Sequence, residues 1–246
     1  MNTIMRCGLF GKLGAKRDFI ALSTPRGFVE AWEPWVQSSL SASRYQLGER
    51  WQQAFLTAPV WRFWLGADIC GTSVVGAIMS SLDGMGRYYP LTLHVMADAG
   101  APFAPPDVDA QDEWFAVAES FLLSTLVQDA TFDDITSGLD RLAAPRTRFD
   151  VVGETSILSL GNEMVGMVVR GADFATTLSA LRASSPEVYA AASFWWTAGG
   201  GDFPPLALSC RGLPDPYRYS TLLTGDLSEP VRRGEIAHAP WSSEAR

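Results

Sequence analysis

Residues 81–91 read SLDGMGRYYPL and join two apolar segments, ICGTSVVGAIM at 69–79 and LTLHVM at 91–96. Both segments have the apolar composition of buried strands. The two glycines between them suit a tight connection, because glycine adopts positive φ without a steric cost. Pro90 has no amide donor, which places it at the start or at the edge of the second strand. The stretch therefore predicts two strands joined by a short loop, which is a plain turn, a catalytic loop or a recognition loop.

Helical patterns and further short strands flank this pair. Phe28, Trp32 and Trp35 recur every three to four residues, which predicts one buried face of a helix. Thr131 and Asp134 have the spacing of a capping box at the start of another helix. The remaining expected elements are strands at 5–10, 60–65, 157–160, 164–169, 192–197 and 206–209, and helices at 47–55, from Asp109 onward and at 173–181. Trp114 and Leu126 are expected on the inner face of the helix from Asp109. Gly161-Asn162 is the expected turn between two of the strands, and Asp173 is the expected N-cap of the last helix.

This mixture of helices and short strands determines the expected fold class. Strands joined by short turns and interspersed with helices favour an α+β fold, an α/β sandwich with a largely antiparallel central sheet flanked by helices. We expect residues 1–231 to form a single domain. Residues 232–246 are polar and aperiodic, which is typical of a flexible C-terminal tail.

Composition and charge exclude several classes of partner. The chain has 246 residues and a formal net charge of −8, with an isoelectric point near 4.8. Binding to nucleic acid or to an anionic membrane requires clustered positive charge, so neither partner is expected.

Cys7, Cys70 and Cys210 are far apart in apolar surroundings, as expected for free thiols in a reducing compartment. With no secretion signal and no apolar stretch of membrane-spanning length, the sequence predicts a soluble cytoplasmic protein without membrane insertion.

The inventory of reactive side chains gives little support for catalysis. There are two histidines, His94 and His238, and no CxxC or HExxH motif, so no metal site is expected. His94 lies within an apolar strand and no GxSxG motif accompanies it. Gly11 and Lys12 lack the spacing of a phosphate-binding loop. We therefore predict no catalytic residues and no cofactor.

Charged residues in apolar surroundings are the remaining candidates. Asp18, Arg62, Asp83 and Arg87 lie among aromatic or apolar neighbours. An unpaired charge in such surroundings costs several kcal/mol, so we expect Asp18 or Asp83 to pair with Arg62 or Arg87. A recognition surface is the functional interpretation, because a guanidinium binds carboxylate or phosphate groups well. Catalysis by these residues is less favoured, because they provide no evident nucleophile or base.

Five motifs, taken together, resemble the TagF family, also called ImpM, of accessory proteins encoded with bacterial type VI secretion systems. They are GLFGKL…RDF at 8–19, GFVEAWEPWV at 27–36, LTAPVWRFWL at 56–65, GAIMSSLDGMGRYYPLTL at 76–93 and SFWWTAGG at 193–200. Two departures are visible. The chain has Ser80 before Ser81 where the family usually has Pro-Ser, and Arg17 where the family usually has glycine before Asp18 and Phe19.

The resemblance implies a non-catalytic cytoplasmic regulator that restrains assembly of the secretion machine after translation. The implied partner is the forkhead-associated scaffold protein Fha, and the implied fold is an α/β sandwich. The resemblance provides no catalytic residues, so the matching positions are interpreted as a structural or partner-binding signature. These positions are Asp18, Phe19, Trp61, Arg62, Asp83, Gly86 and Arg87.

Two other functions stay open at this point, as does the oligomeric state. The first is a hydrolase or phosphate-handling enzyme that uses Asp83, Arg87 and His94. It requires these three side chains to converge on one accessible cleft. The second is a structural subunit of the secretion machine.

Overall fold

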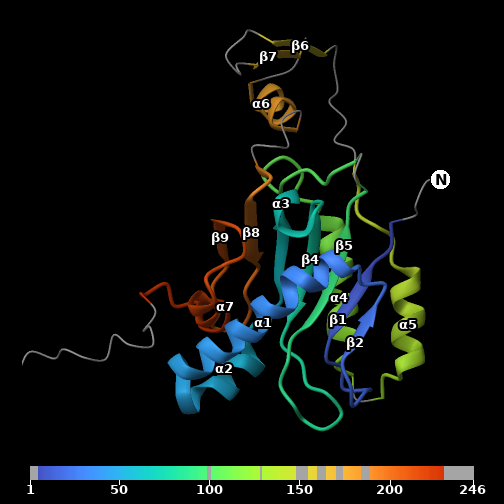
Figure 1. Cartoon of the computed structure of the whole chain (residues 1–246), viewed down its shortest axis with the longest axis vertical. Coiled ribbons are helices and arrows are strands. Elements are labelled where there is room, and N and C mark those ends of the chain that lie inside the picture. The colour runs from blue at the N-terminus through green and yellow to red at the C-terminus, as the bar shows by residue number, and fades with distance from the viewer. Residues whose placement is uncertain are drawn as a thin grey trace, which may run out of the picture.

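The computed structural model describes residues 5–98, 101–127, 129–147, 155–159, 165–169, 174–183 and 189–229. A seven-stranded sheet runs through the molecule in the order β2-β1-β5-β4-β3-β8-β9, and every neighbouring pair is antiparallel (Figure 1). Its strands are β1 (Gly8–Gly11), β2 (Ile20–Leu22), β3 (Trp61–Leu65), β4 (Val74–Met79), β5 (Leu91–Met96), β8 (Ala192–Thr197) and β9 (Leu206–Arg211). The helices are α1 (Arg26–Leu47), α2 (Trp51–Thr57), α3 (Ala67–Cys70), α4 (Asp112–Ser124), α5 (Phe132–Arg141), α6 (Phe174–Ala183) and α7 (Tyr219–Thr224), with 3₁₀ turns at Gly48–Arg50 and Pro216–Arg218. This arrangement confirms the α+β sandwich with an antiparallel sheet.

The strands on either side of the SLDGMGRYYPL loop pair as predicted, with Met79 opposite Leu91 and Val74 opposite Met96. The first strand is shorter than expected. Its first two predicted residues, Ile69 and Cys70, instead end the single helical turn α3, which closes with a hydrogen bond from the Gly71 amide to the Ala67 carbonyl, 2.8 Å long. A helical turn of this kind is too short to show a period in the sequence.

One face of the sheet is covered by α1, α2 and α7 (Figure 1). Phe28, Trp32 and Trp35 are buried on α1, which confirms the predicted helix face. The rings of Trp32 and Trp35 lie 5.8 Å and 5.1 Å from the ring of Trp195, which projects from β8. Large aromatic rings of this kind contribute much of the apolar area that a core buries. Residues from the C-terminal third of the chain therefore complete this core.

The other face is covered by α4 and α5. The predicted capping box begins α5, because the Thr131 hydroxyl accepts from the Asp134 amide and the Asp134 carboxylate accepts from Thr131. Phe115 and Phe121 are the buried aromatic residues of α4, whereas Trp114, which was expected on the inner face, is only half-buried. Leu126 was expected on the inner face but is 56% exposed, because α4 ends at Ser124.

The second half of the chain contains a separate two-stranded sheet of β6 (Thr155–Ser159) and β7 (Val165–Val169), which lies with α6 apart from the main sheet (Figure 1). Arg182 of α6 forms a 2.6 Å ion pair with Asp107, in the connection before α4. The predicted turn at 161–162, the helix cap at Asp173 and the tail at 232–246 lie outside the described residues.

The first two strands of the sheet differ from expectation. β1 begins at Gly8 instead of residue 5, and β2 was not predicted, because its three residues are too few to show an alternating pattern.

Cys7 and Cys70 are buried free thiols and Cys210 is half-buried. Burial raises the pKa of the Cys7 and Cys70 thiols to about 12. Within the described part of the chain, we find no helix with the length and apolar character needed to cross a membrane.

Candidate functional site

The loop between β4 and β5 is organised around the buried side chain of Asp83. Its Oδ1 atom accepts hydrogen bonds from the amides of Met85 and Arg87, both 2.9 Å long. Its Oδ2 atom accepts from Lys12 Nζ at 2.8 Å and from Arg87 Nε at 2.7 Å. The Asp83 side chain has no exposed area, whereas 59% of the Arg87 side chain is exposed. The predicted Asp83–Arg87 pair is thus confirmed, with Lys12 as a second cation.

This arrangement determines the ionisation of Asp83. Burial alone would raise the pKa of the carboxyl group. The hydrogen bonds from Lys12, from the amides of Arg87 and Met85 and from the Arg87 guanidinium outweigh burial and hold the pKa of Asp83 well below its ordinary value. The carboxylate is therefore charged and fully paired at neutral pH, which is the state of a structural anchor and not that of a general base.

The same network joins this loop to the loop between β1 and β2. The Gly84 amide donates to the Lys16 carbonyl at 2.7 Å, and Arg87 Nη2 donates to the Arg17 carbonyl. A Cβ atom at Gly84 would lie 3.1 Å from the Gly14 carbonyl oxygen, so the close approach of the two loops favours glycine there. Gly86 has φ of 77°, a conformation that other residues rarely adopt. We call residues 14–19 and 83–88 the paired loops.

Two apolar side chains project from the paired loops. Phe19 is 49% exposed and Met85 is 62% exposed. The Phe19 ring packs edge-on against Tyr89 with centroids 4.5 Å apart, and Lys12 Nζ lies 5.2 Å from the centre of the same ring. Apolar side chains that gather on one exposed surface mark protein-binding sites, so these two side chains make the paired loops a candidate contact surface.

Asp18 and Arg62 do not belong to this network, which corrects the expected alternatives. Asp18 is exposed on the loop between β1 and β2. Arg62 lies on β3 and forms a two-pronged ion pair with Glu119 of α4, with distances of 2.7 Å and 3.1 Å. A further contact of 3.2 Å joins Arg62 to Asp112. Arg62 therefore fastens α4 to the sheet, a contact that the sequence did not indicate.

Trp61 is buried, and its indole nitrogen donates to the Leu222 carbonyl at 2.8 Å. It links β3 to α7, which is a structural role. Of the seven predicted signature residues, the paired loops contain Asp18, Phe19, Asp83, Gly86 and Arg87, whereas Trp61 and Arg62 lie on β3.

His94 does not join Asp83 and Arg87. It is 1% exposed, its Nε2 atom lies 3.1 Å from the Thr24 hydroxyl, and its ring stacks on Phe28 at 4.0 Å. Burial lowers the pKa of His94 to about 3. Because His94 is enclosed within the core, the convergence required by the enzyme hypothesis is not present. In the described part of the chain no cluster of metal-ligating side chains occurs either.

The buried imidazole predicts a pH-dependent stability. The unfolded chain binds a proton at His94 near pH 6.5, whereas the folded chain stays neutral there down to about pH 3. The stabilisation from this difference is complete above pH 6.5 and is lost as pH falls, by roughly 2–3 kcal/mol at pH 4.5. Chemical denaturation at pH 7.5 and pH 4.5 measures it. His94→Phe should show a smaller loss between the two pH values, and an equal loss would contradict this assignment.

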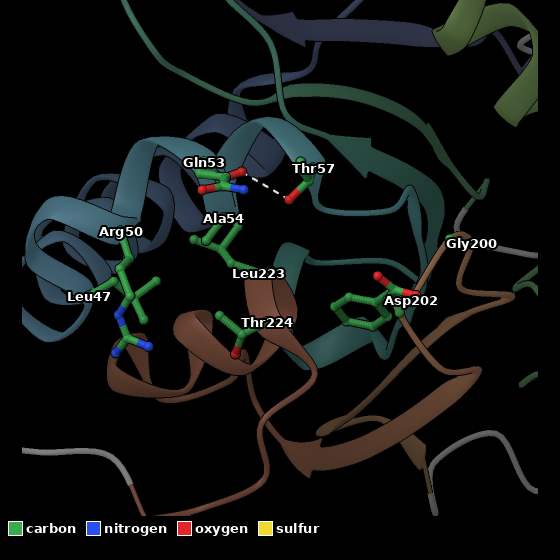
Figure 2. Close-up of a pocket in the computed structure, with 11 residues that line it drawn as sticks. Leu47, Arg50, Gln53, Ala54, Thr57, Gly200, Asp202, Leu223 and Thr224 are labelled. Atoms are coloured by element: carbon green, nitrogen blue, oxygen red, sulfur yellow. Dashed lines mark hydrogen bonds between the residues drawn. The ribbon is translucent and has the colours of Figure 1, made fainter.

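A groove of about 580 Å³ lies between α2, α7 and the loop that joins β8 and β9 (Figure 2). Arg50 lies at one end and Asp202 at the other, with the apolar side chains of Ala54 and Leu223 between them. The volume is typical of a site for a small ligand or short peptide. The sequence did not indicate this groove, because three segments far apart in the chain form it. Its lining includes no histidine or cysteine, so it offers a binding surface without an evident nucleophile.

Comparisons with known proteins agree with this fold. The family model of the TagF N-terminal domain, described as type VI secretion system-associated, matches residues 8–142. A solved structure, that of PA0076 from Pseudomonas aeruginosa PAO1, is 31% identical in sequence, and the alignment covers 93% of this chain and 99% of that chain with a TM-score of 0.75. No curated protein matches the chain. The matched segment contains Lys12, Asp83 and Arg87, and the chain belongs to the TagF family of type VI secretion system-associated proteins.

Proposed function

We propose that this protein is a non-catalytic accessory protein that restrains a type VI secretion system after translation by binding one of its cytoplasmic components. Membership of the TagF family supports the link to secretion. The expected component is the forkhead-associated scaffold protein Fha. Binding is favoured over catalysis because Asp83 and Arg87 are paired with each other, while His94 is enclosed in the core.

The paired loops are the proposed contact surface. The observation that carries this proposal is the exposure of Phe19 and Met85 on loops that the buried Asp83 carboxylate fixes in place. A surface that is already ordered loses little conformational entropy when a partner binds. Arg17 is also exposed on the same loops and adds a cation beside the two apolar side chains.

Replacement of both exposed apolar residues should weaken binding without unfolding the protein. The Phe19→Ser/Met85→Ser variant is expected to bind the secretion component at least about tenfold more weakly, since each buried apolar side chain contributes about 1.5–3 kcal/mol. Binding is measured by calorimetry with purified Fha, and secretion by the amount of exported substrate in a strain that lacks the native gene. The wild-type gene should lower secretion in that strain, and the double variant should not.

Val117→Ser is the matched control, because Val117 is 53% exposed on α4, outside the paired loops. It should bind and repress like the wild type. Unchanged secretion on deletion of the gene, together with no binding to Fha, would refute the proposed function. Binding that survives in the double variant would refute only the proposed surface. Stable cofractionation with the assembled envelope complex would favour a structural subunit instead.

A further inference from the structure

The paired loops carry a local excess of positive charge on an otherwise acidic chain. Lys16, Arg17 and Arg87 are exposed there, whereas Asp18 is the exposed acid of the same loops. Asp83 does not offset these cations for an incoming partner, because its carboxylate is buried and already forms two ion pairs. The whole chain has a net charge of −8. The exposed charge of this surface is therefore opposite in sign to that of the protein as a whole.

These cations have few partners within the molecule. Among the described residues, neither Lys16 nor Arg17 forms an ion pair, and Lys16 Nζ lies 4.0 Å from the centre of the Phe132 ring. Arg87 donates from Nε to Asp83 and from Nη2 to the Arg17 carbonyl, which fixes the plane of its guanidinium group. Its Nη1 atom has no hydrogen-bond partner in the described part of the chain. A fixed donor thus remains available to a carboxylate of another molecule.

The exposed apolar side chains of the same loops link these cations to binding. Met85 lies two residues from Arg87, and Phe19 lies two residues from Arg17. A partner that covers the apolar pair therefore also removes water from the neighbouring guanidinium groups. Removing water from a cation is unfavourable unless a counter-ion replaces it. The partner must accordingly bring carboxylates to this surface, and the same requirement disfavours neutral and basic partners.

We propose that the paired loops bind an acidic segment of the partner protein, in which Asp or Glu residues flank one or two large apolar side chains. The apolar side chains of that segment contact Phe19 and Met85. Its carboxylates pair with Lys16, Arg17 and Arg87. This inference rests on the proposed function, because it names the chemistry that the same surface recognises. The net charge of the protein does not prevent such binding, since physiological salt screens exposed charges beyond about 8 Å.

Nucleic acid and anionic membranes fit this surface less well. Polybasic segments that bind membranes have about four to eight clustered Lys and Arg residues, and tight binders of DNA neutralise about six to ten phosphates. Here the exposed cations are fewer, and Asp18 interrupts them. Both polyanions also extend beyond the loops and meet the acidic remainder of the protein, whereas a short acidic segment contacts the loops alone.

Salt and charge reversal test the inference with the proposed partner. The dissociation constant of the complex with purified Fha, measured by calorimetry, should rise by roughly 3- to 30-fold as sodium chloride increases from about 50 mM to about 300 mM. At the lower concentration, Lys16→Glu/Arg17→Glu should raise it by roughly 5- to 50-fold. Both side chains are exposed, so the variant should melt within a few degrees of the wild type.

Arg26→Glu/Arg211→Glu is the matched control. It changes the net charge by the same amount at two exposed positions outside the paired loops. Its dissociation constant should stay within about threefold of the wild-type value. Binding to Fha that responds neither to salt nor to reversal of Lys16 and Arg17 overturns the inference and leaves the proposed function intact. Equal weakening by the two charge-reversal variants also overturns it, because the effect then belongs to the net charge.

A synthetic peptide separates the chemistry of the surface from the identity of the partner. A fluorescein-labelled peptide in which glutamates flank one leucine and one phenylalanine should raise its anisotropy with the full-length protein, and Lys16→Glu/Arg17→Glu should reduce that binding. Binding of this peptide without binding of Fha supports the inference and refutes Fha as the partner. Equal binding of a peptide with lysine in place of glutamate overturns the inference. Tighter binding to phosphatidylserine vesicles or to single-stranded DNA than to the glutamate peptide overturns it as well.

Discussion

Replacing Asp83 by alanine is expected to lower the free energy of unfolding by about 3–5 kcal/mol, because the change leaves the largely buried Lys12 ammonium without its counter-ion. The amides of Met85 and Arg87 lose their acceptor as well. For a chain of this length, such a loss corresponds to a fall in melting temperature of roughly 10 °C. Thermal and chemical denaturation monitored by circular dichroism measure both quantities.

Asp18→Ala is the matched control for this experiment. Asp18 is a carboxylate in the same pair of loops but is exposed, so its replacement should change stability by no more than about 0.5 kcal/mol. Adding Lys12→Met to Asp83→Ala should recover part of the loss, because it removes the unpaired charge. A loss below about 1 kcal/mol for Asp83→Ala would show that the ion pair is not the anchor of the paired loops.

A chain that ends at residue 142, the limit of the family match, is expected not to fold. It lacks β8, so β3 becomes an unprotected edge and the cluster around Trp32 loses the buried ring of Trp195. Loss of one buried tryptophan side chain alone costs about 3–5 kcal/mol. The truncation also removes α7, whose backbone accepts the Trp61 hydrogen bond. Together these losses reach the whole stability of a typical domain, about 5–15 kcal/mol.

The matched comparison is a chain that ends at residue 231. We propose residues 1–231 as a single domain, and this chain should melt within a few degrees of the full-length protein. The measurement is the presence of one cooperative unfolding transition and of dispersed amide resonances. A cooperative transition in the 142-residue chain would contradict the single domain and would place an independent unit inside the matched segment.

Local signals in the sequence predicted the local structure well. The capping box of Thr131 and Asp134 and the periodic aromatic residues of α1 follow from neighbours within one or two helical turns. The Asp83–Arg87 pair was also accessible, because both residues lie in one loop. Such features depend on spacing alone, and spacing is visible in a sequence.

Contacts between distant segments were not predictable in the same way. Lys12 reaches Asp83 across 71 positions of the chain, and nothing near Lys12 identifies that partner. Several acidic residues in the sequence could have paired with Arg62. Only the packing of α4 on β3 determines that its partners are Glu119 and Asp112. The position of β8 beside β3 likewise depends on how the whole sheet is assembled.

That position of β8 has a consequence during protein synthesis. β3 ends at Leu65, and its neighbour β8 begins at Ala192, about 130 residues later. At roughly 5–20 residues per second, a ribosome needs about 6–25 s to deliver the missing neighbour. Throughout that interval β3 lacks its neighbouring strand β8, and the aromatic rings around Trp32 lack the ring of Trp195. The nascent chain therefore exposes an apolar, aggregation-prone surface for many seconds. Its yield in the cell is expected to depend on the supply of chaperones and on the speed of translation.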